Sequence, residues 1–117
     1  MVGQKPADAL MVGSSCATHK TDLHLSADQA ERVADLFKTL GHPVRAQIVM
    51  MLSRGGGDVC VCDIERHFDV SQPTISHHLK KLRDAGVVYG VQHGLWVHYS
   101  LVPGVLETLR QFLNGLD

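Results

Sequence analysis

The chain has 117 residues, 44% of them hydrophobic, and a formal net charge of −1. This length suffices for one domain with its own core, and the near-neutral charge argues against a protein that coats nucleic acid nonspecifically, because Lys and Arg supply most nonspecific affinity. No apolar run approaches the roughly 20 residues that span a bilayer, and residues 1–15 lack the pattern of a secretory signal, so we expect a soluble, cytoplasmic protein.

The N-terminal part of the chain predicts an arm followed by a helix. Residues 1–25 mix Gly, Ser, Pro and isolated apolar residues without sustained periodicity, and we interpret them as a flexible arm in front of one domain over residues 26–117. Ser26 followed by Gln29 resembles a capping box, and apolar residues at helical spacing then continue until Gly41, where we expect the first helix to end.

The middle of the chain predicts three more helices. Pro43 suits the first turn of a helix that ends at the glycines 55–57. A short helix is expected over Val59–Phe68, and Ser71 can cap another over residues 71–85. Two helices joined by about three residues form a helix-turn-helix.

The C-terminal part predicts a hairpin and a last helix. Val87–Val91 and Trp96–Leu101 are β-rich and are joined by the turn Gln92-His93-Gly94. Pro103 can begin a helix whose apolar stripe a small monomer cannot cover, so we expect the first and last helices to form a dimer surface. The predicted fold is mainly α with a β-hairpin, a winged helix-turn-helix in the order α-α-α-α-β-β-α.

Small polar and amide side chains occupy the face of the helix at 71–85 that its apolar residues leave free. Gln72 can bind adenine through two hydrogen bonds, and Lys80 or Lys81 can bind phosphates. His77 and His78 can also donate to phosphate, and the tip of the hairpin can reach a minor groove. An ordinary solvated helix face and an ordinary turn are the alternatives. The candidate DNA contacts are Gln72, Thr74, Ser76, His77, Lys80 and His93.

Cys60 and Cys62 form the second constellation. Side chains two apart in a regular helix diverge by about 200°, so both sulfurs reach one ion only if the start of the helix is distorted. An ion bound there would strain the helix before the one at 71–85, and thiolates favour soft or borderline ions. Cys16 can add a third sulfur and His19 a nitrogen, from the same chain or from a partner subunit. The alternative is that both cysteines are small buried hydrophobes.

A thiol redox sensor is another class that the three cysteines allow. Oxidation of Cys16, Cys60 or Cys62 would then release DNA without metal, although a disulfide between two cysteines so close in sequence would be strained. The sequence has no phosphate-binding glycine loop, no nucleophile elbow and no zinc-protease motif, so we do not expect an enzyme.

Over about residues 27–113 the chain resembles the ArsR/SmtB family of metal-sensing bacterial repressors. The resemblance is carried by Leu40-Gly41-His42-Pro43-Val44-Arg45, Val59-Cys60-Val61-Cys62-Asp63, Ser71-Gln72-Pro73-Thr74-Ile75-Ser76-His77-His78-Leu79, Leu82-Arg83-Asp84-Ala85-Gly86 and Gly94-Leu95-Trp96-Val97-His98-Tyr99. It implies a homodimeric repressor that leaves its operator DNA when an inducer binds. We expect the operator to be an imperfect inverted repeat.

The segment from Cys60 resembles the arsenite-sensing box of this family, with one departure. In the best-known arsenic sensors a third cysteine lies three residues after the second, and here that position is Glu65. The resemblance then makes Cys16 the third ligand for trivalent arsenic or antimony, while two sulfurs alone would suit a singly methylated arsenical. It also allows a cadmium, lead or zinc sensor, in which Cys16, His19, Cys60 and Cys62 hold the ion.

Overall fold

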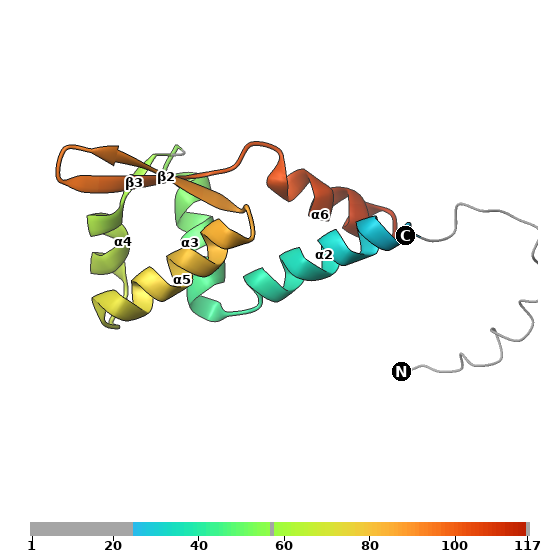
Figure 1. Ribbon diagram of the computed structural model, residues 1–117, viewed down its shortest axis with the longest axis horizontal. Helices are drawn as coiled ribbons and strands as arrows, with labels where there is room; N and C mark the ends of the chain where they lie inside the picture. The colour runs from blue at the N-terminus through green and yellow to red at the C-terminus, as the bar shows by residue number, and fades with distance from the viewer. Residues whose placement is uncertain (1–24, 57, 117) are drawn as a thin grey trace, which may run out of the picture. The chain divides into compact units, whose positions relative to one another are not determined.

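The structure is a computed structural model that describes residues 25–56 and 58–116 (Figure 1). The arm predicted over residues 1–25, with Cys16 and His19, therefore lies outside the described residues apart from Leu25. Contacts divide the chain into two units, Met1–Ala30 and Glu31–Asp117. The elements are α2 (Ala27–Leu40), α3 (Pro43–Arg54), β1 (Val59–Cys60), α4 (Val61–His67), α5 (Gln72–Asp84), β2 (Val88–His93), β3 (Trp96–Leu101) and α6 (Val105–Asn114).

Local signals set the start of the first helices as predicted. At α2, the Ser26 N–H donates to Gln29 Oε1 at 3.0 Å and the Gln29 N–H donates to Ser26 Oγ at 3.1 Å, which confirms the capping box. At α3, Pro43 occupies the first turn as expected, and His42 is the N-cap, because its Nδ1 accepts from the Val44 N–H at 3.1 Å. The capping role of His42 was not predicted.

The helix expected from Val59 begins two residues later, at Val61. Val59 and Cys60 instead form β1, which pairs antiparallel with β3 so that Val59 lies opposite Tyr99 and Cys60 opposite His98. A partner about 40 residues away in sequence thus determines the conformation of this segment. The predicted winged helix-turn-helix is confirmed, with one short strand added to the predicted order.

The hairpin of β2 and β3, which we call the wing, lies in the predicted region of the chain, but its predicted turn is wrong. Gln92 and His93, expected in the turn, extend β2 because they pair with Val97 and Trp96, and the turn lies at residues 94–95. The register of the wing extends from Val88 opposite Leu101 to His93 opposite Trp96, and β3 is the middle strand of the sheet. Val88 and Tyr99 are the buried residues of the wing, and Tyr99 lies opposite Gly90. A Cβ on Gly90 would lie 3.0 Å from the Tyr99 ring, so only glycine leaves room for that ring.

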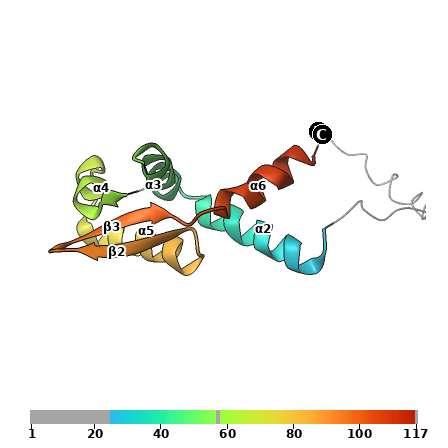
Figure 2. The ribbon, with the colours of Figure 1, turned by 90° about the horizontal axis from the view of Figure 1, so that it is seen from above.

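The helices α3, α4 and α5 lie on one side of the wing, below it in Figure 1, and Figure 2 shows the same layer from above. The core draws on all five helices and the wing: Val33, Leu36, Ile48, Val49, Leu52, Ile64, Ile75, Leu79, Leu82, Val87, Val88, Tyr99, Val105 and Leu109. In α5 this includes the predicted stripe of Ile75, Leu79 and Leu82. None of the described helices combines the length and the apolar character needed to cross a bilayer.

The last helix, α6, leaves apolar side chains uncovered. Its Phe112 ring meets the Phe37 ring of α2 edge to face, with centroids 5.7 Å apart. Phe37 of α2 is 42% exposed, Leu113 of α6 is 52% exposed, and Leu116, which follows α6, is 65% exposed. The dimer surface predicted on the first and last helices stays a prediction, and these side chains are available for it.

Candidate DNA interface and cysteine pair

The first turn of α5 is fixed by hydrogen bonds within the helix-turn-helix. Ser71 caps the helix, because its Oγ accepts from the Thr74 N–H at 3.3 Å, and the two hydroxyl groups lie 2.9 Å apart. Gln72 donates from Nε2 to Glu65 Oε1 at 2.9 Å, across from α4. The Thr74 hydroxyl group therefore already has a hydrogen-bond partner in Ser71. Gln72 is exposed, and its side-chain amide is held in place by Glu65 of α4.

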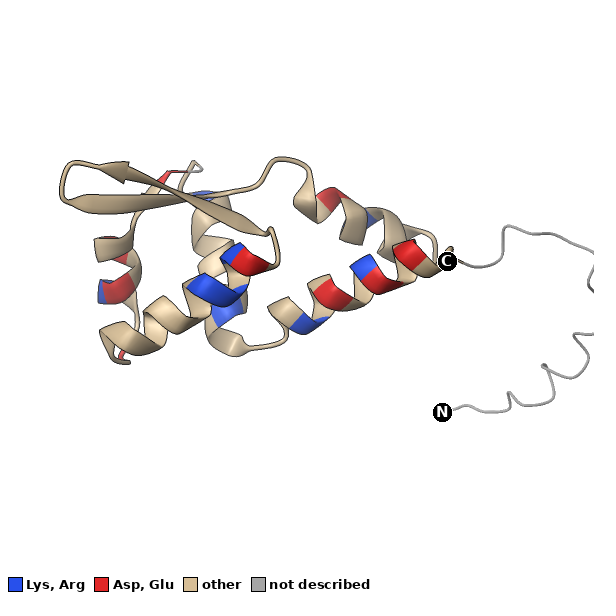
Figure 3. Cartoon of the chain, in the orientation of Figure 1, with Lys and Arg blue, Asp and Glu red and all other residues tan. Residues whose placement is uncertain are grey.

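Basic side chains follow along the same helix. Lys80, Lys81 and Arg83 lie in the second half of α5, where Figure 3 shows blue segments, and Asp84 is the last residue of the helix. Lys80 donates to Asp84 Oδ2 at 2.8 Å, and this hydrogen bond lowers the pKa of the Asp84 carboxyl. Both partners are well exposed, so the ion pair contributes little stability and Lys80 can exchange its carboxylate for a phosphate. Ser76 and His77 are exposed as well.

His78 is not a surface residue, so the prediction that it donates to phosphate is wrong. Its side chain is 5% exposed and its Nδ1 lies 3.1 Å from Arg45 Nη1. Because a guanidinium only donates, Nδ1 accepts and the ring proton resides on Nε2. Arg45 also donates from Nε to the Thr39 carbonyl oxygen at 2.6 Å. His78 thus belongs to a polar contact that joins the C-terminal end of α2, α3 and α5.

Burial lowers the pKa of His78 below its ordinary value of 6.5, and the neighbouring His42, Arg45 and His77 lower it further. The unfolded chain therefore binds this proton more readily than the folded one. The stability gained from neutral His78 is present above pH 6.5 and is lost as the pH falls from there toward the lowered pKa.

We accordingly expect the free energy of unfolding to fall when the pH drops below 6.5, and His78→Gln to reduce this dependence. The glutamine carbonyl can still accept from Arg45 but does not titrate. Urea unfolding followed by circular dichroism at several pH values measures the slope. His77→Gln is the matched control on the exposed neighbour, and an unchanged slope in His78→Gln would contradict the expectation.

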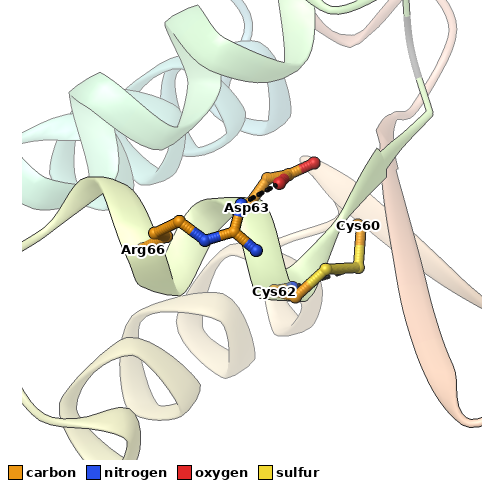
Figure 4. A network of polar contacts seen from close by, with 4 residues as sticks. All are labelled: Cys60, Cys62, Asp63 and Arg66. Carbon is orange, nitrogen blue, oxygen red and sulfur yellow. Dashed lines mark hydrogen bonds and ion pairs between the residues drawn. A yellow bond between two sulfur atoms is a disulfide. The ribbon is translucent and has the colours of Figure 1, made fainter.

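The two cysteines lie side by side at the junction of β1 and α4 (Figure 4). Cys60 is extended, with φ −64° and ψ 138°, and is the N-cap of α4, where its Sγ accepts from the Cys62 N–H at 3.2 Å. Since Cys60 precedes the helix, the divergence expected within a regular helix does not apply. The structure joins the two sulfurs as a disulfide. Both residues are half-buried, which disfavours a purely apolar role.

The surroundings of the cysteine pair are polar. Asp63 Oδ1 accepts from Arg66 Nη1 at 2.8 Å on the exposed side of α4 (Figure 4). Glu65, which stands where the resemblance places a third cysteine, is engaged with Gln72. Within the described part of the chain the pair therefore supplies two sulfurs, and the predicted ligands Cys16 and His19 lie outside it.

The wing tip brings together residues that the sequence analysis had not connected. The His93 ring lies beside the His98 ring, with centroids 4.5 Å apart, and His98 Nδ1 lies 3.0 Å from Asp58 Oδ1. Only His93 was predicted as functional. The signal for His98 was its spacing of two from Trp96 in a strand, which places both on the face of His93, whereas Asp58 joins them only through the unpredicted β1.

Comparison with known proteins identifies relatives that belong to one family. The family profile for bacterial regulatory proteins of the arsR family matches residues 42–89. The chain is 37% identical over 81 residues to the arsenic resistance transcriptional regulator ArsR1 of Pseudomonas putida, covering 69% of this chain and 62% of that protein. It is 46% identical over 70 residues to the arsenical resistance operon repressor of Escherichia coli, covering 60% of this chain and 59% of that protein.

A solved structure shows the same fold. The crystal structure of a possible transcriptional regulator for arsenical resistance superimposes with a TM-score of 0.62 at 30% identity, covering 70% of this chain and 83% of that one. The chain spans about three fifths of the length of the two curated relatives, since it covers 62% and 59% of them. The residues that the family profile matches include the helix-turn-helix and the positions of Cys60 and Cys62.

Proposed function

The chain belongs to the ArsR family of bacterial transcriptional regulators, and from this we propose that it is a homodimeric repressor that releases its operator when trivalent arsenic or antimony binds its cysteines. It is a regulator and not an enzyme. The names of the relatives from Pseudomonas putida and Escherichia coli, both referring to arsenic resistance, support the choice of inducer.

The observation that carries the proposal is the adjacency of the Cys60 and Cys62 sulfurs at the start of α4. Reduction of the disulfide by two molecules of a cellular thiol, which are themselves oxidised to a disulfide, gives two neighbouring thiols at Cys60 and Cys62. Each thiol then condenses with a hydroxyl group of arsenous acid, forming one As–S bond and releasing one water. Soft sulfur donors favour such an ion over magnesium or calcium. Cys16 is proposed as the third ligand from the sequence.

The cysteine pair is connected to both elements that we propose to bind DNA. Through β1 it is paired with β3 of the wing, and through α4 it reaches α5, where Glu65 accepts from Gln72. An ion that pulls on Cys60 and Cys62 therefore acts on both elements. The proposed DNA contacts are Gln72, Thr74, Ser76, His77, Lys80 and His93.

The proposed assembly follows from the apolar surface of α2 and α6. A dimer through Phe37, Leu113 and Leu116 would cover these exposed side chains and place two α5 helices about one DNA turn apart, on an imperfect inverted repeat. We also propose a cytoplasmic location, because free thiols for metal binding persist in a reducing compartment.

Operator release is the test of this function. A fluorescent duplex, selected from a random library by the reduced protein, is followed by anisotropy while arsenite, antimonite, cadmium, lead, zinc and hydrogen peroxide are added in separate titrations. We expect arsenite and antimonite to weaken DNA binding by about 5- to 150-fold, the usual range of allosteric coupling. Release by cadmium, lead or zinc without release by arsenite would contradict the arsenic proposal and favour the alternative metal sensor.

The disulfide between Cys60 and Cys62 favours a second candidate, a thiol redox regulator. In this case peroxide oxidises one thiol to a sulfenic acid and is itself reduced to water, and the second thiol then displaces water to form the disulfide. DNA release by peroxide alone, reversed by dithiothreitol, would support this candidate. Release by arsenite in the presence of reductant would support the first.

A further inference from the structure

Asp58, His93 and His98 form a compact group on the wing. One ligand atom from each of the three side chains lies within 4.8 Å of the others, the one such group of His, Cys, Asp or Glu that could hold a metal within residues 25–56 and 58–116. We propose that these residues form a metal site for a first-row divalent ion of the zinc, cobalt or nickel kind, separate from the cysteines.

The donor set determines the class of ion. Two imidazole nitrogens and one carboxylate oxygen suit borderline first-row ions and leave a coordination position for water. Calcium and magnesium prefer sites made of oxygen donors alone, and trivalent arsenic binds preferentially to sulfur, so none of these three ions matches this group. The wing site and the cysteine pair therefore select different ions by chemistry alone.

The sheet register places the three ligands on one face. Cys60, His98 and Val91 lie opposite one another across β1, β3 and β2, and His93 follows two residues after Val91. Residues paired across strands, and those two apart along a strand, share a face. Asp58 stands two residues before Cys60, at the entry to β1. The ligands line a hollow of about 330 Å³.

The present contacts arrange the ligands before an ion binds. The hydrogen bond between Asp58 Oδ1 and His98 Nδ1 measures 3.0 Å, and the two imidazole rings have centroids 4.5 Å apart. An ion bound by both side chains would replace the hydrogen bond between the carboxylate and the imidazole. His98 is 28% exposed and Asp58 62% exposed, so an ion can enter from solvent without opening the core.

An ion in this site would tie the wing tip to the entry of β1. His93 would then be held by metal rather than free to reach a minor groove, and its position would be coupled to Asp58, next to β1. Any change in operator affinity that follows from holding His93 in this way rests on the proposed function of the protein. The metal site itself does not, and it is tested without DNA.

The test measures zinc and cobalt binding to the full chain with Cys16, Cys60 and Cys62 replaced by serine. Serine at position 60 retains an oxygen that can cap α4, so the fold should survive. Calorimetry is expected to show one zinc ion bound per chain, and Co²⁺ should give a ligand-field spectrum without a thiolate charge-transfer band. In this background His93→Ala and Asp58→Asn should each weaken zinc binding by at least about 10-fold.

His67→Ala is the matched control, because His67 is an exposed histidine of α4 outside the group, and its zinc affinity should be unchanged. The proposal is overturned if the cysteine-free chain binds no zinc, or if His67→Ala weakens binding as much as His93→Ala. A wild-type protein that keeps its operator DNA in arsenite, while the cysteine-free chain still binds zinc, would exclude the proposed function and leave the wing site intact.

Discussion

Cys60→Ser is expected to abolish the release of operator DNA by arsenite while leaving DNA binding intact. The substitution removes one of the two adjacent sulfurs, and a hydroxyl group is a poor ligand for trivalent arsenic. Serine can still accept the Cys62 N–H that Cys60 Sγ accepts at 3.2 Å, so the start of α4 is retained. Anisotropy titrations should show the variant bound to DNA at arsenite concentrations that weaken wild-type binding by about 5- to 150-fold.

Cys62→Ser should behave in the same way, since it removes the other sulfur of the pair. Asp63→Asn is the matched control: its side chain interacts with Arg66 on the exposed side of α4, and its arsenite response should equal that of the wild type. A Cys60→Ser protein that still releases DNA with arsenite would exclude this cysteine from the ligand set. Unfolding curves of each variant would separate lost response from lost fold.

Ile75→Ala is expected to lower the free energy of unfolding by about 2–5 kcal/mol, the usual cost of truncating a large buried aliphatic side chain. Ile75 has no exposed surface and lies on the inner side of α5, the helix that we propose to read DNA. Alanine at this position would leave a cavity under the helix. Urea denaturation of the reduced protein, with and without the substitution, measures the difference.

Lys81→Ala is the control for Ile75→Ala, because Lys81 is an exposed residue of the same helix. Its effect on the free energy of unfolding should stay within about 0.5 kcal/mol. A loss below about 1 kcal/mol in Ile75→Ala would contradict the expected packing.

Signals within a few residues allowed most helix starts to be predicted. The capping box of Ser26 and Gln29, the Pro43 start of α3 and the Ser71 cap of α5 each depend on atoms no more than three residues apart. The wing was equally local, because its two strands are adjacent in sequence. These features depend little on the rest of the fold.

The features that were missed depend on distant partners. The strand β1 exists because Cys60 meets His98, and Asp58 joins the histidines of the wing for the same reason. A regular helix from Val59 would make the two cysteine side chains diverge, and the sequence indicated that both sulfurs can reach one ion only if the start of that helix is distorted. The structure meets this condition through β1, which the sequence did not predict.

His78 illustrates a different limit. Its position, three residues after Ile75 and one before Leu79, lies on the buried stripe of α5, so the periodicity indicated burial. The polar residue type suggested the opposite. Burial is tolerated because Arg45, 33 residues earlier in the chain, supplies a hydrogen bond to the ring.

The strand β1 is one of the two edge strands of the sheet and pairs with β3 at only two positions, whereas β2 and β3 pair over six residues each. Local opening of a protein begins where few contacts must be broken. β1 can therefore detach while the hairpin and the buried core keep their structure. After reduction of the disulfide, the reactivity of half-buried Cys60 toward large reagents would then follow the frequency of this local opening rather than that of global unfolding.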